Sequence, residues 1–174
     1  DNEFLLTLRG KKQNLRYGEN PHQDAFVLSF KNNEQEVGVG TAPVLQGKAL
    51  SYNNLLDADA AWKCNSDVLH SVSLKNQKAV TIIKHANPCG VAVGENLLTC
   101  LEQAWECDAV SAFGSIICFS YTVTKEIAEW LGKRFVEIVI APNYDEEALA
   151  VFEKKKNLRV LVLPVKNEKT QETV

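Results

Sequence analysis

The chain has 174 residues, of which 45% are hydrophobic and 24% are charged, and its formal net charge is −3. This length suits one ordinary domain with a hydrophobic core, and the composition is typical of a globular protein. The charge gives no reason to expect bulk attraction to nucleic acid or to an anionic membrane, and no hydrophobic run is long enough to span a bilayer.

The N-terminal third is rich in turn-forming residues. Residues 1–15 are predicted to be a connector, with a short apolar run from Phe4 to Leu8. Residues 16–24 combine polar groups with glycine and an Asn-Pro pair, which predicts a turn-rich loop. A strand is expected at 25–30, and residues 31–54 are expected to form a loop.

From residue 55 onward the pattern alternates between helix and strand. Apolar residues at helical spacing predict the helices, and short apolar runs rich in β-branched residues predict the strands. This alternation indicates an α/β sandwich with a mostly parallel sheet. The predicted helices lie near 55–70, 96–107, 124–134 and 145–155, and the predicted strands at 79–84, 115–120, 136–141 and 158–163. The polar segment 165–174 is expected to be a loose tail or a point of truncation.

Cysteine and methionine usage bears on the compartment and on completeness. The five cysteines include no Cys-x-x-Cys pair, and several fall in predicted helices or strands. A disulfide scaffold is therefore not expected, and a reducing cytoplasm is favoured. The chain neither begins with Met nor contains one, so it is either a fragment or a sequence from which methionines have been omitted.

The most informative pair of residues is Lys84-His85, which follows the predicted strand 79–84 and precedes an Asn-Pro-Cys-Gly turn. Ligand sites in α/β proteins usually lie at strand ends. A lysine supplies positive charge there, and a histidine supplies a proton acceptor near neutral pH. The alternative is a solvated lysine at a strand end beside a structural histidine in the core. Neighbouring side chains on a regular strand point to opposite faces, so for both residues to reach one substrate the backbone at 84–90 is expected to be irregular.

Two further loops contain candidate binding residues. Arg16, Tyr17 and His22 offer a guanidinium, a phenol and an imidazole on one loop, and arginine favours bidentate contact with phosphate or carboxylate. Phe113 and Gly114 could form an apolar wall and a close approach for a flat ligand. The alternatives are a polar surface loop and an ordinary helix–strand connection in which Phe113 is an anchoring residue. If the first loop is functional, its three candidate residues are expected to lie in one cleft with Lys84 and His85.

No metal site is expected. Zinc deaminases use His-x-Glu followed by Pro-Cys-x-x-Cys, whereas here Asn87 follows His85 by two residues and one cysteine follows Pro88. These are too few ligands for zinc. A lone Gly-x-Gly at 38–40 is weak support for a dinucleotide site.

Taken together, five collinear motifs resemble one family, the AICAR transformylase part of the bacterial bifunctional AICAR transformylase/IMP cyclohydrolase. The resemblance extends from about residue 4 to about residue 164. The stretch between Gly114 and Val136 is about one residue shorter than in the family, which fits an omitted methionine. The motifs are Leu15-Arg-Tyr-Gly-Glu-Asn-Pro-His-Gln23, Gly47-Lys-Ala-Leu-Ser-Tyr-Asn-Asn-Leu-Leu-Asp57, Lys84-His-Ala-Asn-Pro-Cys-Gly-Val-Ala92, Ser111-Ala-Phe-Gly114 and Phe135-Val-Glu-Ile-Val-Ile-Ala-Pro142.

The resemblance implies a fold, a reaction and a domain organisation. It implies a cytidine-deaminase-like sandwich, with 1–15 as a linker and 16–164 as the first of two transformylase subdomains. The family transfers a formyl group from 10-formyltetrahydrofolate to the 5-amino group of AICAR, with no metal, as a cytoplasmic homodimer that also makes IMP. Neither nucleic acid nor a membrane is an expected partner.

The resemblance also assigns site residues. Lys84 and His85 match the catalytic pair. The positions that match substrate contacts are Arg16, Tyr17, His22, Asn54, Phe113, Gly114 and Glu137.

Two alternatives to an active formyltransferase remain at this stage. A half-domain with the same motifs could bind a nucleotide or support assembly without catalysis. A zinc deaminase of the same fold is the other, and the missing ligands argue against it. The isolated chain is expected to be inactive, because one subdomain provides only part of a site that must enclose both a folate and a nucleotide.

Overall fold

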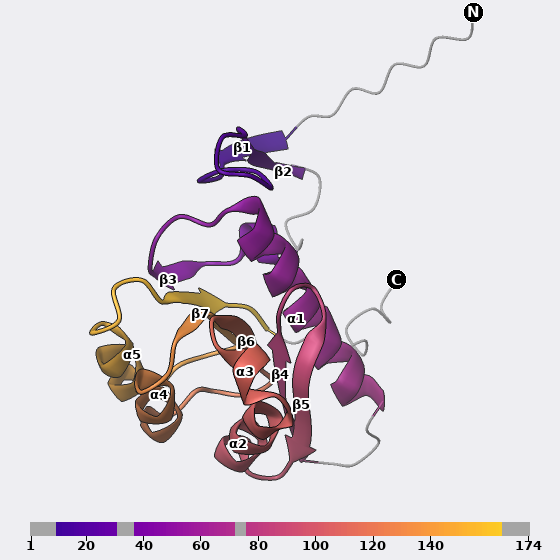
Figure 1. Cartoon of the computed structure of the whole chain (residues 1–174), viewed down its shortest axis with the longest axis vertical. Helices are drawn as coiled ribbons and strands as arrows, with labels where there is room; N and C mark the ends of the chain where they lie inside the picture. Colours follow the sequence, from indigo (N-terminus) through magenta and orange to yellow (C-terminus); the bar gives the residue numbers. More distant parts are fainter. Residues whose placement is uncertain (1–9, 31–36, 72–75, 165–174) are drawn as a thin grey trace, which may run out of the picture.

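The computed structural model describes residues 10–30, 37–71 and 76–164. These residues form a six-stranded sheet with helices on both faces, together with a separate two-stranded sheet near the N-terminal end (Figure 1). The apolar run from Phe4 to Leu8 and the predicted tail 165–174 lie outside the described residues.

The main sheet is mixed. The strands β6, β7 and β8 pair in parallel, whereas β4 is antiparallel to both β6 and β5, and β3 is antiparallel to β8. Four of the six strands therefore run in one direction, and β3 and β4 run in the other. In spatial order the strands are β3 (Val44–Gln46), β8 (Arg159–Val162), β7 (Val136–Ala141), β6 (Ser115–Phe119), β4 (Lys78–Ile83) and β5 (Pro88–Gly94).

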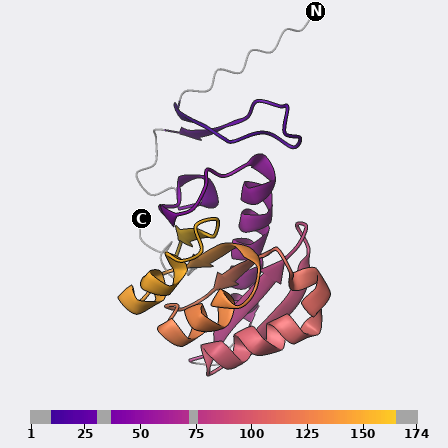
Figure 2. The same cartoon turned by 60° about the vertical axis from the view of Figure 1, so that its left-hand side comes forward.

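Helices cover the two faces of this sheet. Alternate residues of one strand point to opposite faces, so Ile116 packs in the core beneath α1 while Ile117 packs in the core beneath the other helices. Figure 2 shows these other helices gathered along one side of the sheet. Helix α1 (Tyr52–Ser71) covers one face, and the other is covered by α2 (Leu97–Cys107), α4 (Lys125–Gly132) and α5 (Glu146–Phe152), with the short α3 (Ala109–Ala112) preceding β6.

The predicted α/β class is confirmed, and so are the four predicted helices and the four strands predicted after residue 78, which lie together in the main sheet. The strand predicted at 25–30 is also present, as a strand of the separate two-stranded sheet. Four of the six strands run in one direction, as a mostly parallel sheet requires, although directly paired parallel strands are confined to β6, β7 and β8. Several elements were not predicted, among them one inside the expected connector 1–15 and two inside the expected loop 31–54. The unpredicted elements are β1 (Gly10–Asn14), η1 (Val39–Thr41), β3, β5 and α3.

A buried asparagine joins α1 to the sheet. Asn65 is fully buried on the face of α1 that packs against the sheet. Its side-chain amide donates hydrogen bonds to the carbonyl oxygens of Ala79, at 3.2 Å, and of Cys118, at 3.0 Å. Because a buried polar group is costly unless it is hydrogen-bonded, these contacts fix where α1 lies across β4 and β6.

The N-terminal hairpin is connected to the start of α1. β1 pairs antiparallel with β2 (Phe26–Phe30), and the intervening residues form the loop that contains Arg16 and Tyr17. The Arg16 amide donates to the Leu50 carbonyl at 2.8 Å, and the Tyr52 amide donates to the Tyr17 carbonyl at 3.0 Å. These two bonds place the loop beside the N-terminus of α1.

Candidate active site

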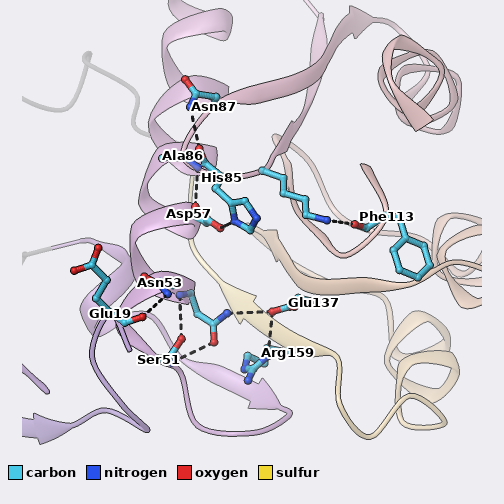
Figure 3. Close-up of polar contacts among 12 residues, drawn as sticks. Glu19, Ser51, Asn53, Asp57, His85, Ala86, Asn87, Phe113, Glu137 and Arg159 are labelled. Carbon is cyan, nitrogen blue, oxygen red and sulfur yellow. Dashed lines mark hydrogen bonds and ion pairs between the residues drawn. The ribbon is translucent and has the colours of Figure 1, made fainter. Parts of the chain in front are cut away.

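The candidate site lies along one row of strand ends of the main sheet, here called the edge. Because β4 is antiparallel to β6, the carboxyl end of β4 lies at the same edge as the amino ends of β6, β7 and β8. The N-terminal half of α1 contacts this edge through Asn54 and Asp57 (Figure 3). Side chains from α1, β7 and β8 meet there with side chains from the turn after β4 and the loop before β6.

The chain leaves β4 after Ile83 through a short turn, residues 84–87, here called the β4 turn. The Lys84 amide donates to the Asn87 carbonyl at 2.9 Å, and the Asn87 side chain donates to the His85 carbonyl at 2.9 Å. Ala86 has a φ of 54°. The predicted irregular backbone at 84–90 is thus confirmed for 84–87, but it is wrong for 88–90, because β5 begins at Pro88.

Lys84 reaches toward the loop before β6. Its Nζ donates a hydrogen bond to the Phe113 carbonyl oxygen at 2.5 Å. The next residue, Gly114, has a φ of 75°, and a Cβ there would lie 3.1 Å from the Phe135 ring and 3.6 Å from the Lys84 Nζ. Glycine therefore permits both the backbone conformation and the close approach of these two side chains.

Phe113 forms an exposed aromatic surface beside Lys84. Its ring centroid lies 5.1 Å from that of Phe135, and the residue is 58% exposed. A core anchor would be buried, so the exposed ring disagrees with the interpretation of Phe113 as an anchoring residue. The ring is available to contact a flat apolar ligand.

His85 is not a core histidine, because its side chain is 80% exposed. Its Nδ1 lies 3.4 Å from Oδ2 of Asp57, whose side chain is only 9% exposed. The other oxygen of the same carboxylate, Oδ1, accepts a hydrogen bond from the Ala86 amide at 2.7 Å. One buried carboxylate thus contacts both the imidazole and the backbone of the β4 turn (Figure 3).

A second group of polar residues, here called the Glu137 cluster, consists of Ser51, Asn54, Glu137 and Arg159. The Asn54 side-chain amide donates to Glu137 Oε2 at 3.2 Å, and Arg159 Nη1 lies 4.0 Å from the same oxygen. Ser51 and Asn54 also contact each other's backbone amides through their side chains, at 3.3 and 3.2 Å. Oε2 of Glu137 thus has both an amide donor and a guanidinium beside it, and Figure 3 shows Arg159 next to this carboxylate.

Arg159 is a buried cation held by carbonyl groups. Its Nε donates to the Lys48 carbonyl at 3.0 Å, and its Nη2 donates to the Ala49 carbonyl at 3.4 Å. Burial lowers the pKa of the guanidinium, Glu137 opposes this effect, and nearby Arg16 lowers the pKa further. Arginine nevertheless stays protonated in proteins, so Arg16 and Arg159 form a region of positive charge next to Glu137.

The loop that contains Arg16, Tyr17 and His22 lies near Arg159, but it makes no direct polar contact with Lys84 or His85 in the described part of the chain. Arg16 lies over the Tyr17 ring, 5.3 Å from its centroid, and both residues act electrostatically on Arg159. His22 is exposed in the same loop. Among the described residues, no hydrogen bond or ion pair joins Arg16 or His22 to Lys84 or His85, so a single cleft containing all of them stays a prediction. A shallow groove nearby is lined by Gly18, Glu19, Gln23, Asp24 and Tyr52.

Other chemistries have little support in the described part of the chain. No group of three or more His, Cys, Asp or Glu side chains there could hold a metal ion. Burial raises the pKa of the Cys89 thiol, so it is not an activated nucleophile. No helix within these ranges has both the length and the apolar character needed to cross a membrane.

Sequence reasoning missed Asp57 and Arg159 as site residues. Asp57 lies three residues after Asn54, a spacing that places both on one face of α1. Arg159 is a lone cation at the start of a strand of buried apolar residues. A charged residue at a position that should be buried is the signal that could have identified each of them.

Comparisons with known proteins agree with the motifs. The family model described as AICARFT/IMPCHase bienzyme matches residues 2–174. The chain is 50% identical over 148 residues to the bifunctional purine biosynthesis protein PurH of Bartonella tribocorum, covering 85% of this chain and 26% of that protein. It is 48% identical over 159 residues to PurH of Aquifex aeolicus, covering 91% of this chain and 30% of that protein. The chain therefore spans about a quarter to a third of these relatives' length.

Solved structures align with this chain at low sequence identity. A putative formate dehydrogenase accessory protein from Desulfotalea psychrophila aligns over 63% of this chain and 56% of its own, with a TM-score of 0.50 and 9% identity. A dCMP deaminase from the cyanophage S-TIM5 aligns over 57% of this chain and 92% of its own, with a TM-score of 0.44 and 11% identity. The first of these likenesses concerns the fold alone.

Proposed function

The chain belongs to the AICARFT/IMPCHase bienzyme family, and on this premise we propose that it forms part of a formyltransferase site for purine biosynthesis. The reaction is transfer of the formyl group from 10-formyltetrahydrofolate to the 5-amino group of AICAR. One observation supports this proposal above others. Lys84 and His85, adjacent at the end of β4, contact two different partners, Phe113 and Asp57, at the edge where the Glu137 cluster lies.

His85 is the proposed general base. The AICAR amine is a weak nucleophile, because its lone pair is delocalised toward the carboxamide, so its attack requires removal of a proton. An imidazole titrates near neutral pH and suits this task. With Nδ1 directed at Asp57, the exposed ring offers Nε2 to the substrate.

Lys84 is the proposed electrostatic catalyst. As the amine nitrogen bonds to the formyl carbon, the formyl oxygen gains negative charge, which a nearby ammonium stabilises. The bond from the formyl carbon to N10 of the folate then breaks, and N10 takes up a proton from the Lys84 ammonium, which solvent then reprotonates. The amine proton passes to His85, so the products are formyl-AICAR and tetrahydrofolate. Lys84 lies beside Gly114 and the exposed ring of Phe113, which is the proposed wall for the folate.

The Glu137 cluster is the proposed nucleotide-binding part of the site. The Glu137 carboxylate is held by Asn54 and Arg159 and remains partly exposed, so it can accept hydrogen bonds from ribose hydroxyl groups. Arg16 is exposed and can reach a phosphate, for which its guanidinium geometry is suited. Tyr17 and His22 are proposed to complete this contact.

The site is proposed to be completed by polypeptide beyond this chain, and the working form to be a cytoplasmic homodimer. The relatives are three to four times longer than the aligned part, and one subdomain provides only part of an enclosure for two ligands. All five cysteines are free thiols, which favours a reducing compartment. A half-domain that binds nucleotide without catalysis is the competing interpretation.

A formyl-transfer assay separates these interpretations. The full-length protein is incubated with AICAR and 10-formyltetrahydrofolate, and tetrahydrofolate release is followed, beside nucleotide binding measured calorimetrically. Turnover by the full-length protein is expected. Nucleotide binding without any turnover would contradict the catalytic proposal and support the half-domain.

A further inference from the structure

Asp57 occupies an unusual position for a carboxylate. It lies in the first half of α1 on the face that packs against the sheet, and only 6% of the residue is exposed. Buried carboxylates are rare unless they are paired or hydrogen-bonded. The structure provides Asp57 with two partners, and both belong to the β4 turn.

Each oxygen of this carboxylate has a separate partner. Oδ1 accepts the Ala86 amide at 2.7 Å, a short distance for a backbone donor, which fixes the turn directly after His85. Oδ2 faces the His85 Nδ1 at 3.4 Å. This second distance is long for a hydrogen bond, as is common for catalytic contacts before a substrate is bound.

We infer that Asp57 is the positioning residue of His85. Its carboxylate accepts a hydrogen bond from Nδ1–H and thereby leaves Nε2 as the atom that accepts the proton of the attacking amine. When Nε2 becomes protonated, the negative charge of Asp57 stabilises the imidazolium. The inference rests on the proposed function, because it concerns how the base of that reaction is held and which of its nitrogens acts.

Asp57→Asn is the most informative substitution, because it keeps the size of the side chain. The amide oxygen can still accept the Ala86 N–H, so the β4 turn keeps this contact. The amide nitrogen then faces Nδ1 as a donor, which favours the tautomer with the proton on Nε2. That tautomer cannot accept a proton from the amine at Nε2.

The test is done in the full-length protein by formyl-transfer kinetics. Asp57→Asn is expected to lower kcat about 10- to 100-fold, the range known for residues that orient metal-binding side chains through a hydrogen bond. Binding of AICAR, measured by calorimetry, is expected to stay unchanged. The matched control is Asp59→Asn, which also removes a carboxylate from α1. The Asp59 carboxylate pairs with Lys63 at 2.7 Å and not with the β4 turn, so kcat of this variant is expected to stay unchanged.

A double-mutant cycle separates positioning from a general structural role. If Asp57 acts through His85, adding Asp57→Asn to a His85→Ala protein causes no further loss of kcat. Asp57→Glu keeps a carboxylate near Nδ1 and is expected to recover part of the activity. If Asp57→Asn does not fold, the same cycle is run with Asp57→Glu.

Three results would overturn the inference while leaving the proposed function in place. They are an unchanged kcat in Asp57→Asn, an equal loss of kcat with and without His85, or equal losses in the Asn and Glu variants. Absence of formyl transfer by the wild-type full-length protein is a different failure, because it removes the proposed function itself.

Discussion

The β4 turn and the Glu137 cluster lie at the same edge of the sheet, but they are assembled in different ways. Lys84 and His85 are neighbours in the sequence, and each is directed to a different partner, Phe113 and Asp57. The Glu137 cluster instead joins side chains from three distant segments around one carboxylate. A local motif thus provides one region, and tertiary structure provides the other.

The two regions also differ in exposure. The His85 side chain is largely exposed and its partner Asp57 is buried. In the Glu137 cluster the arginine is the buried group, with 7% of its side chain exposed, and Glu137 is partly exposed. The buried group is thus an anion beside a base in the β4 turn, and a cation beside a carboxylate in the Glu137 cluster. We therefore expect changes in the β4 turn to act on the chemical step, and changes around the Glu137 cluster to act on binding.

Loss of His85 is expected to have the largest effect. His85→Ala removes the proposed general base, and general base catalysis contributes about 10²- to 10⁴-fold to rate. Single-turnover formyl transfer by the full-length protein measures this loss. The control is His70→Ala, an exposed histidine near the C-terminal end of α1, which should not change the rate. Equal rates in the His85→Ala and wild-type proteins would remove the base from the proposed mechanism.

Loss of Lys84 is expected to come next. Removing one group that stabilises an oxyanion costs about 10²- to 10³-fold in kcat. Lys84→Ala should cause a fall of this size in steady-state turnover, with AICAR affinity less affected. Lys63→Ala is the control, because Lys63 is exposed on α1 and pairs with Asp59. A Lys84→Ala enzyme that turns over normally would contradict the central role given to this residue.

The sequence predicted the elements around the site better than their directions. Asn87-Pro88 and Gly90 indicated a turn that continues to residue 90. In the structure an outermost strand, β5, already begins at Pro88, and proline is tolerated as the first residue of a strand. The missed β5 forms a hairpin with β4 and makes β4 antiparallel to β6. Were β4 parallel to β6, Lys84 and Phe113 would lie at opposite edges of the sheet. Strand–helix alternation contains no information about such a reversal.

The two missed charged residues show a second limit of sequence reasoning. The apolar stripe of α1 indicates which face is buried, but it does not show that the sheet edge provides an amide and an imidazole for Asp57. Arg159 likewise begins an apolar strand, and its partners are the carbonyl groups of Lys48 and Ala49, more than a hundred residues earlier. Contacts at such separations depend on packing and not on local pattern.

Loss of Arg16 is expected to weaken binding more than chemistry. A hydrogen bond to a charged group is worth about 1.5–3 kcal/mol, so Arg16→Ala should weaken AICAR binding about tenfold or more. A phosphate contact exists in the ground state and the transition state alike, so kcat at saturation should remain. Calorimetry gives the affinity, and Lys11→Ala, an exposed cation on β1, is the control. Unchanged affinity would show that Arg16 does not contact the nucleotide.

The smallest expected effect concerns the loop that holds Arg159. Gly47 has a φ of 102°, and a Cβ there would lie 2.6 Å from the Leu158 carbonyl oxygen and 2.8 Å from Cγ of Arg159. Gly47→Ala should therefore destabilise the fold by more than about 1 kcal/mol, since alanine is strained at positive φ and this site has no free space. Gly38→Ala is the matched control, because Gly38 has an extended φ of −169° and a Cβ there would have no neighbouring atom within 4 Å.

The measurement for this pair is the midpoint of urea unfolding, with AICAR affinity determined on the same samples. Because the Lys48 and Ala49 carbonyls that bind Arg159 directly follow Gly47, the Gly47 variant should also lose some affinity, whereas the Gly38 variant should lose none. Equal unfolding midpoints would mean that the loop moves aside at little cost. In that case Arg159 would be held mainly by burial and by Glu137, and the two regions at this edge would be less different than the comparison implies.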